Sequence, residues 1–195
     1  MNALPLEPRV WFLGSGPSAF SARWREWLLH RVGGMLPVWR GGVGIDQHVA
    51  SARAVVAAGG VFVLIPEGGV GGPPDRLAPF RFGAALIALR TGAPILPVAI
   101  AGSAELYIGR RLATRVLSPT SVVELLGTDW PEDGRLPEPG SRAELELGHR
   151  LTERFADLLG PAVAELYPRT VDPPDRRRRL RSLTWLFLAR PRGSH

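Results

Sequence analysis

Apolar positions along the chain alternate between short continuous runs and amphipathic stretches. The continuous runs predict strands at 9–13, 35–39, 61–65, 95–100 and 122–126. Apolar residues spaced three and four apart predict helices at 19–32, 46–58 and 81–90, and a further helix behind the Ser141-x-x-Glu144 capping box. The run at 61–65 is apolar at every position, which is typical of a strand buried on both faces of a parallel sheet. The alternation predicts an α/β fold with a mostly parallel central sheet flanked by helices.

The character of the chain changes after residue 168. A proline-rich linker at 172–175 precedes four consecutive arginines at 176–179 and an apolar stretch at 180–189. We therefore predict one domain at 1–168, followed by a linker and a basic amphipathic tail at 169–195. The arginines and apolar side chains of 176–190 suit a segment lying on an anionic membrane surface. A disordered tail and a helix packed on the domain are the alternatives.

Composition narrows the classes of function. With 195 residues, 45% of them apolar and 22% charged, the chain has the balance of a globular protein. It has no cysteine, and its four histidines lack ligand spacing, so we expect no metal site. No run is long and apolar enough to span a membrane, and the first nine residues do not resemble a signal peptide, so we expect a cytoplasmic protein.

The net charge of +6 favours an anionic partner. All 24 basic residues are arginine, which suits a phosphorylated metabolite, an anionic lipid surface or nucleic acid, although a biased coding composition explains the absence of lysine equally well. The arginines are spread along the chain without a basic strand interleaved with aromatic residues. Nucleic acid is therefore the least favoured of these partners.

The strongest candidate site is the loop that follows the run at 61–65. Pro66, Glu67, Gly68 and Gly69 follow a predicted parallel strand, and open α/β sheets bind ligands at the carboxyl ends of their strands. Glycines in such a loop allow backbone N–H groups to approach an anion closely. The alternative is a mobile glycine-rich connection.

Four segments resemble blocks of the glycerolipid acyltransferase family, the lysophosphatidate and glycerol-3-phosphate acyltransferases. GMLPVWRG at 34–41 resembles the second block, and IPEG at 65–68 resembles the third, F-P-E-G-T-R-S. PFRFG at 79–83 is similar to the P-F-K-x-G segment, and APILPVAIAGS at 93–103 resembles the fourth block. The segments occur in the family's order and spacing and cover about a third of the chain.

The resemblance implies a glycerol-3-phosphate acyltransferase-like fold and a transferase of phospholipid biosynthesis. Such an enzyme moves an acyl chain from acyl-CoA or acyl-carrier protein to the hydroxyl of a lysophospholipid or glycerophosphate, with no further cofactor, and we expect it on the inner face of the membrane. By resemblance, Arg40 binds the acceptor phosphate, and Glu67, Gly68 and Gly69 shape the same pocket. Arg81 supplies positive charge in place of the family's loop arginine.

Two departures from the family pattern affect the expected chemistry. The third block continues as Gly69-Val70-Gly71 instead of threonine, arginine and serine, and no H-x4-D motif is present to supply a general base. We therefore identify no catalytic residue. Either the start of the chain is internal to a longer reading frame, which we favour, or the chain is a degenerate member of the family. The alternative function is a catalytically inactive family member or an arginine-driven membrane-surface module.

Overall fold

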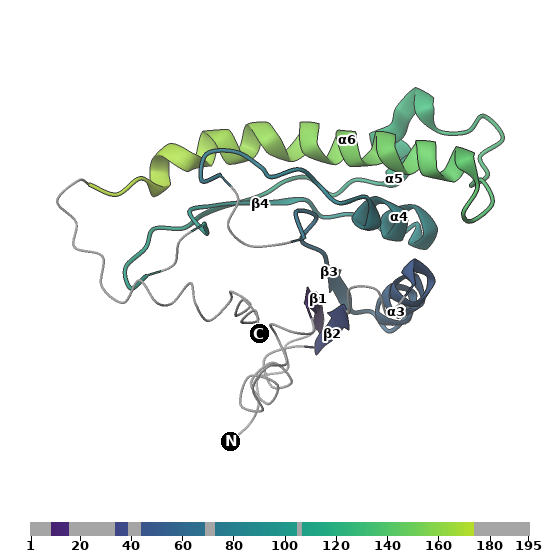
Figure 1. The fold of residues 1–195 in the computed structure, drawn as a ribbon, viewed down its shortest axis with the longest axis horizontal. Coiled ribbons are helices and arrows are strands. Elements are labelled where there is room, and N and C mark those ends of the chain that lie inside the picture. The colour runs from purple at the N-terminus through teal and green to yellow at the C-terminus, as the bar shows by residue number, and fades with distance from the viewer. Residues whose placement is uncertain (1–8, 16–33, 39–43, 69–72, 105–106, 174–195) are drawn as a thin grey trace, which may run out of the picture. The chain divides into compact units, whose positions relative to one another are not determined.

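The computed structural model describes residues 9–15, 34–38, 44–68, 73–104 and 107–173. The chain divides into two compact units, one of Met1–Ile65 with Phe187–His195 and the other of Pro66–Leu186. Figure 1 shows the elements of each unit. The helix predicted at 19–32 and the tail at 174–195 lie outside the described residues, and the predicted domain boundary at 168 stays a prediction.

The first unit contains a three-stranded parallel sheet. Its strands are β1 (Val10–Ser15), β2 (Gly34–Val38) and β3 (Val61–Val63), in the order β2-β1-β3. Helix α3 (Ile45–Ala57) follows β2 and buries one face, made up of Val49, Ala52 and Val55. The strands predicted near 9–13, 35–39 and 61–65, and the helix predicted at 46–58, are thus confirmed.

The expectation that 61–65 is buried on both faces is wrong. Val61 and Ile65 are exposed, and the strand ends at Val63. Among the described residues β3 pairs with β1 alone, so no described strand lies on its other side. In the run at 61–65, an apolar residue at every position is therefore not evidence that the strand is buried on both faces.

The described residues of the second unit form a two-stranded antiparallel sheet and three α-helices. Strand β4 (Val98–Ala101) pairs with β5 (Ala113–Val116). The helices are α4 (Phe82–Thr91), α5 (Val122–Leu126) and α6 (Arg142–Leu166), with short 3₁₀ turns η1 (Gly127–Asp129) and η2 (Tyr167–Thr170). The described strands thus form two small sheets, so the α/β class is present and a single, mostly parallel central sheet is not seen among the described residues.

Helix α6 covers one face of the β4–β5 sheet. It runs beside β4 in Figure 1, and a buried cluster joins the two elements through Ala99, Ala101, Ala162, Val163 and Leu166. α6 has 25 residues, and its predicted apolar stripe is buried at Leu147 and Leu151 and half-buried at Phe155 and Leu158. No helix of the described part of the chain is long and apolar enough to cross a membrane.

The strand predicted at 122–126 is wrong, because these residues form α5. Two neighbouring valines gave the segment its strand-like character, but Ser121 and Glu124 form a capping box that opens a helix. The Ser121 hydroxyl accepts a hydrogen bond from the Glu124 N–H, and the Glu124 carboxylate accepts one from the Ser121 N–H. These two reciprocal bonds satisfy backbone donors that a strand at this position would leave to other partners.

Candidate functional site

Two of the segments that carry the family resemblance lie against each other in the second unit. The Arg81 N–H donates to the Pro66 carbonyl oxygen at 2.7 Å, and the Ala78 N–H donates to Glu67 Oε2 at 2.9 Å. The Glu67 bond joins residues eleven positions apart and closes the intervening loop. Glu67, Gly68 and Arg81, which the sequence analysis predicted as site residues, are therefore brought together.

Gly68 allows the close approach of the Arg81 side chain. Its backbone has φ +65°, a left-handed conformation that residues with a Cβ adopt at a cost. A methyl group added at Gly68 would overlap Cδ and Nε of Arg81. Glycine at this position therefore both permits the turn and leaves room for the arginine to lie across it.

Arg81 combines an exposed positive charge with the N-terminus of a helix. It is the N-cap residue of α4, and no side chain caps that helix end. Among the described residues its guanidinium makes no ion pair, with Glu67 or with any other carboxylate. The first N–H groups of a helix carry partial positive charge, so this end of α4 is electrostatically suited to an anion.

Phe82, the residue after Arg81, fixes this end of α4 to α6. Its ring stacks on the His149 ring with the centroids 4.5 Å apart, and it packs so closely over Gly148 that a methyl group there would overlap it. The small residue on α6 thus accommodates a large aromatic ring on α4. This contact holds the helix end that bears Arg81.

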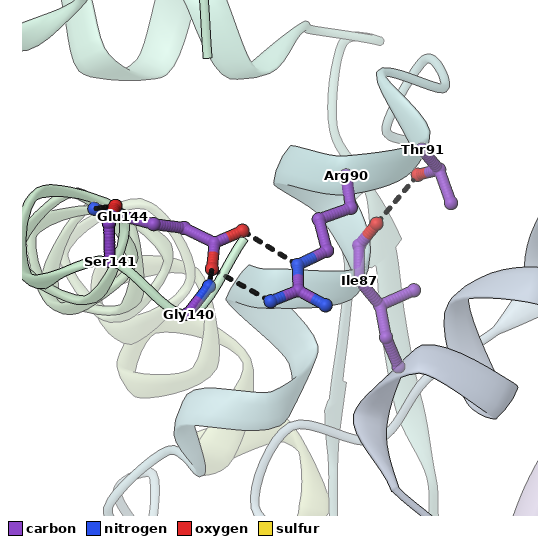
Figure 2. Close-up of polar contacts among 6 residues, drawn as sticks. All are labelled: Ile87, Arg90, Thr91, Gly140, Ser141 and Glu144. Carbon is purple, nitrogen blue, oxygen red and sulfur yellow. Dashed lines mark hydrogen bonds and ion pairs between the residues drawn. The ribbon is translucent and has the colours of Figure 1, made fainter. Parts of the chain in front are cut away.

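The opposite end of α4 is held by a buried ion pair that sequence reasoning missed. Arg90 Nε and Nη2 donate to the two carboxylate oxygens of Glu144 at 2.6 and 2.7 Å, as Figure 2 shows. The exposed fractions of the two side chains are only 10% and 3%. Sequence spacing gives no sign of this pair, since 54 positions separate its members.

The predicted capping box at Ser141 is only half formed. The Ser141 hydroxyl accepts from the Glu144 N–H, but the Glu144 carboxylate accepts from the Gly140 N–H at 2.7 Å, and from Arg90, rather than from the Ser141 N–H. The hydrogen bonds of Arg90 foremost, and that of the Gly140 N–H, hold the pKa of Glu144 below its ordinary value, while burial opposes them. Glu144 is therefore an anion that stabilises the α4–α6 contact.

The remaining predicted site residues cannot be placed. Arg40 and Gly69 lie outside the described residues, so their assignment to the acceptor pocket stays a prediction. Within the described ranges, no group of three histidine, aspartate or glutamate side chains is arranged to hold a metal ion. The site that can be described consists of Glu67, Gly68 and Arg81 with the first turn of α4.

Comparisons with known proteins give one structural match. No protein-family model matches the chain, and no curated protein matches it. Among solved structures, it is matched by the crystal structure of the 1-acyl-sn-glycerophosphate acyltransferase PlsC from Thermotoga maritima, with 18% sequence identity and a TM-score of 0.38. The match covers 77% of this chain and 66% of that one, so the chain spans a little under two thirds of the length of that acyltransferase.

Proposed function

We propose that this chain takes part in acyl transfer to glycerolipids. It binds an acyl thioester donor, on coenzyme A or acyl-carrier protein, and a lysophospholipid or glycerophosphate acceptor. The observation that carries the proposal is the junction between two of the acyltransferase-like segments, IPEG at 65–68 and PFRFG at 79–83. Hydrogen bonds at Pro66 and Glu67 hold the two segments against each other, which supports the proposal because a chance resemblance of separate segments would not require such contact.

Within that site, Arg81 contacts the phosphate group that the acceptors share. A guanidinium offers paired donors in a planar fork that matches two phosphate oxygens. The N–H groups at the start of α4, which begins directly after Arg81, add further donors. Glu67 shapes the loop through Ala78, and Gly68 gives the arginine room. Arg40 and Gly69 complete the pocket in this proposal.

The reaction sets a requirement that the described site does not meet by itself. The acceptor hydroxyl oxygen attacks the thioester carbonyl carbon, an ester bond forms, the carbon–sulfur bond breaks, and the hydroxyl proton ends on the leaving thiol. A positioned base contributes about 10²–10⁴-fold to such a step. None of the four histidines is followed by aspartate in the H-x4-D pattern. We therefore expect the 195-residue chain to bind substrates with little or no turnover.

The absence of H-x4-D also favours a second candidate, a catalytically inactive relative that keeps the binding shell. Both candidates are tested by assaying thioester-dependent acylation of lysophosphatidate alongside equilibrium binding of glycerol 3-phosphate, and only measurable turnover would exclude the inactive relative. Binding without turnover fits both candidates. Rapid turnover by this chain would show that a base other than H-x4-D serves the reaction, and absence of binding by any phosphate-bearing acceptor would remove the proposed function altogether.

We further propose that the segment 176–190 holds the protein on the cytoplasmic, inner face of the membrane, where acceptor and product reside. It lies outside the described residues, and its support is the run of arginines next to apolar side chains. Co-sedimentation with anionic vesicles should be weaker for a chain ending at Asp172 than for the full chain. Equal sedimentation of the two would exclude this role for the segment.

A further inference from the structure

The start of α4 is weakly supported by its own backbone. No side chain caps this helix end, and the first backbone bond, from the Ala84 N–H to the Arg81 carbonyl oxygen, is long at 3.4 Å. The first N–H groups of a helix have no partners within it, so a helix end without a cap frays easily. Contacts with other parts of the chain must therefore hold the residues that begin α4.

Two such contacts lie on either side of the Arg81 Cα. Before it, the Arg81 N–H donates to the Pro66 carbonyl oxygen at 2.7 Å. After it, the Phe82 ring stacks on the His149 ring, with the centroids 4.5 Å apart and the ring planes inclined by 29°. The first contact joins neighbouring parts of the chain, whereas the second reaches across to α6. The backbone from which the Arg81 side chain extends is therefore held in part by a residue of α6.

The His149 imidazole makes this contact through the face of its ring. Among the residues that the structure describes, it forms no hydrogen bond or ion pair. Stacked aromatic rings attract each other beyond the apolar area that they bury, so the stack itself holds Phe82. Gly148 leaves room for that ring, because an added methyl carbon would lie 2.5 Å from Cε2 and 2.8 Å from Cζ of Phe82. Gly148 and His149 thus form the surface on which the Phe82 ring packs.

We propose that His149 is a positioning residue of the acceptor site, acting through Phe82 on Arg81. The stack fixes the first residue of α4, and with it the backbone of the N-cap residue whose side chain lies across Gly68. An arginine that is already held in place loses less conformational freedom when it binds an anion, which raises affinity. The inference rests on the proposed function, since it assigns an effect on the acceptor phosphate to a residue that does not contact the phosphate.

Calorimetric titration of the full chain with glycerol 3-phosphate and, separately, with inorganic phosphate tests the role of His149. His149→Ala removes the stack and should weaken the binding of both anions by about two- to tenfold, the range expected for loss of an aromatic pair. His149→Phe keeps an aromatic face and should bind nearly as well as the unsubstituted chain. In the Arg81→Ala background, His149→Ala should have no further effect, because the two residues act on the ligand as one unit.

Two glycines of α6 provide a matched pair of substitutions. Gly148→Ala adds a methyl group that displaces the Phe82 ring, whereas Gly160→Ala adds one to open space. Only Gly148→Ala should therefore weaken the binding of the two anions. This comparison leaves the His149 side chain in place and changes only the surface beneath Phe82.

Amide hydrogen exchange in the absence of ligand tests the positioning by itself. In an α-helix the N–H of residue i is bonded to the carbonyl oxygen of residue i−4, so the amides of Ala85 and Leu86 report on the first turn of α4. His149→Ala should speed their exchange by about two- to tenfold, and His149→Phe should not. The amide of Arg90, in the last turn, should exchange at an unchanged rate.

Several outcomes would overturn the inference. They are unchanged anion affinity of His149→Ala, an affinity of His149→Phe as low as that of His149→Ala, a further loss in the Arg81→Ala background, and equal effects of Gly148→Ala and Gly160→Ala. If the unsubstituted chain binds neither anion, the proposed function is contradicted and hydrogen exchange decides the positioning role. Faster exchange in the first turn of α4 in His149→Ala would then support that role, and unchanged exchange would overturn it.

Discussion

The two ends of α4 carry the same residue type in opposite settings. Arg90, in the last turn, is buried and hydrogen-bonded through two nitrogens to Glu144. Arg81, the N-cap residue, is exposed and has no ion pair within the described part of the chain. The first arginine complements the negative end of the helix dipole, whereas the second adds positive charge to its positive end. Only the second arrangement gains from an added anion.

The carboxylates beside these arginines differ in the same way. Glu144 and Glu67 each accept a hydrogen bond from a backbone N–H, of Gly140 and Ala78 respectively. Glu144 also neutralises the neighbouring arginine, but Glu67 accepts from a backbone N–H and forms no ion pair with Arg81, which has no other carboxylate partner in the described part of the chain. One end of α4 therefore carries an arginine whose charge is compensated, whereas the arginine at the other end has no ion pair among the described residues.

The largest effect should come from breaking the buried pair. Arg90→Ala leaves the Glu144 carboxylate buried with only its backbone partner, and loss of one member of a buried pair costs about 3–5 kcal/mol in the free energy of unfolding. Arg81→Ala should change that free energy by no more than about 0.5 kcal/mol. Urea denaturation followed by circular dichroism measures both.

The double substitution Arg90→Met/Glu144→Leu is the control for the buried pair. Replacing both charges by apolar residues of similar size should recover most of the stability, because no unpaired charge stays buried. Equal losses for Arg90→Ala and Arg81→Ala would contradict the proposed division of roles between the two ends of α4.

Lowering the pH should also weaken the Arg90–Glu144 ion pair, with a smaller loss of stability than Arg90→Ala causes. The pKa of Glu144 is lowered in the folded chain, chiefly by Arg90, so its contribution is fully present above the unfolded value of about 4.3 and is lost as the pH falls through the folded pKa. Unfolding free energies measured at successive pH values from neutral to acidic should therefore decrease in that window. In Glu144→Gln the decrease should be shallower; an unchanged slope would assign the acid sensitivity to other carboxylates.

Substitutions at two glycines distinguish the effect of backbone strain on stability from an effect on ligand binding. Gly68 and Gly92 both have left-handed backbones, with φ +65° and +60°, so alanine at either position should cost about 1–2 kcal/mol of stability. Only at Gly68 would the added methyl group displace the Arg81 side chain, since the space around Gly92 is open. Calorimetric titration with glycerol 3-phosphate should show weakened binding for Gly68→Ala and unchanged binding for Gly92→Ala. Equal affinities of the two variants for glycerol 3-phosphate would show that Gly68 is not part of the binding site.

The smallest expected change concerns Arg40, which lies outside the described residues. If it contacts the acceptor phosphate together with Arg81, Arg40→Lys keeps the charge but loses the bidentate fork. We expect acceptor affinity to fall by a few-fold while donor affinity is unchanged. Titration with acceptor and with coenzyme A in parallel provides the check, and an unaltered acceptor affinity would remove Arg40 from the pocket.

Local patterns in the sequence were sufficient to predict several elements. The helix at α3, the start of α6 at Ser141 and the strands of the parallel sheet follow from periodicity and capping residues over short stretches. They failed at α5, where two valines suggested a strand although Ser121 and Glu124 were already the residues of a capping box. The Ser-x-x-Glu spacing at 121–124 indicates a helix start more directly than the two valines indicate a strand.

The residues that contact one another at the candidate site were predictable in part for the same reason, and their role as a site stays a prediction. Glu67, Gly68 and Arg81 belong to short segments whose residues were recognisable, and their junction lies within one stretch of the chain. The Arg90–Glu144 pair was not predictable, because its members come from different helices far apart in sequence. The sequence also does not indicate that the Glu144 carboxylate accepts hydrogen bonds from the Gly140 N–H and from Arg90 instead of from the Ser141 N–H.

The most direct test of the account is calorimetric titration of the full chain and of two variants with glycerol 3-phosphate. The account predicts saturable binding that Arg81→Ala weakens by about tenfold or more, as expected for loss of a charge-assisted hydrogen bond. Arg142→Ala, which removes an exposed arginine on α6, should leave the affinity unchanged. Binding that is absent from the unsubstituted chain, or that both variants weaken equally, would contradict the assignment of the α4 N-terminus as the acceptor site.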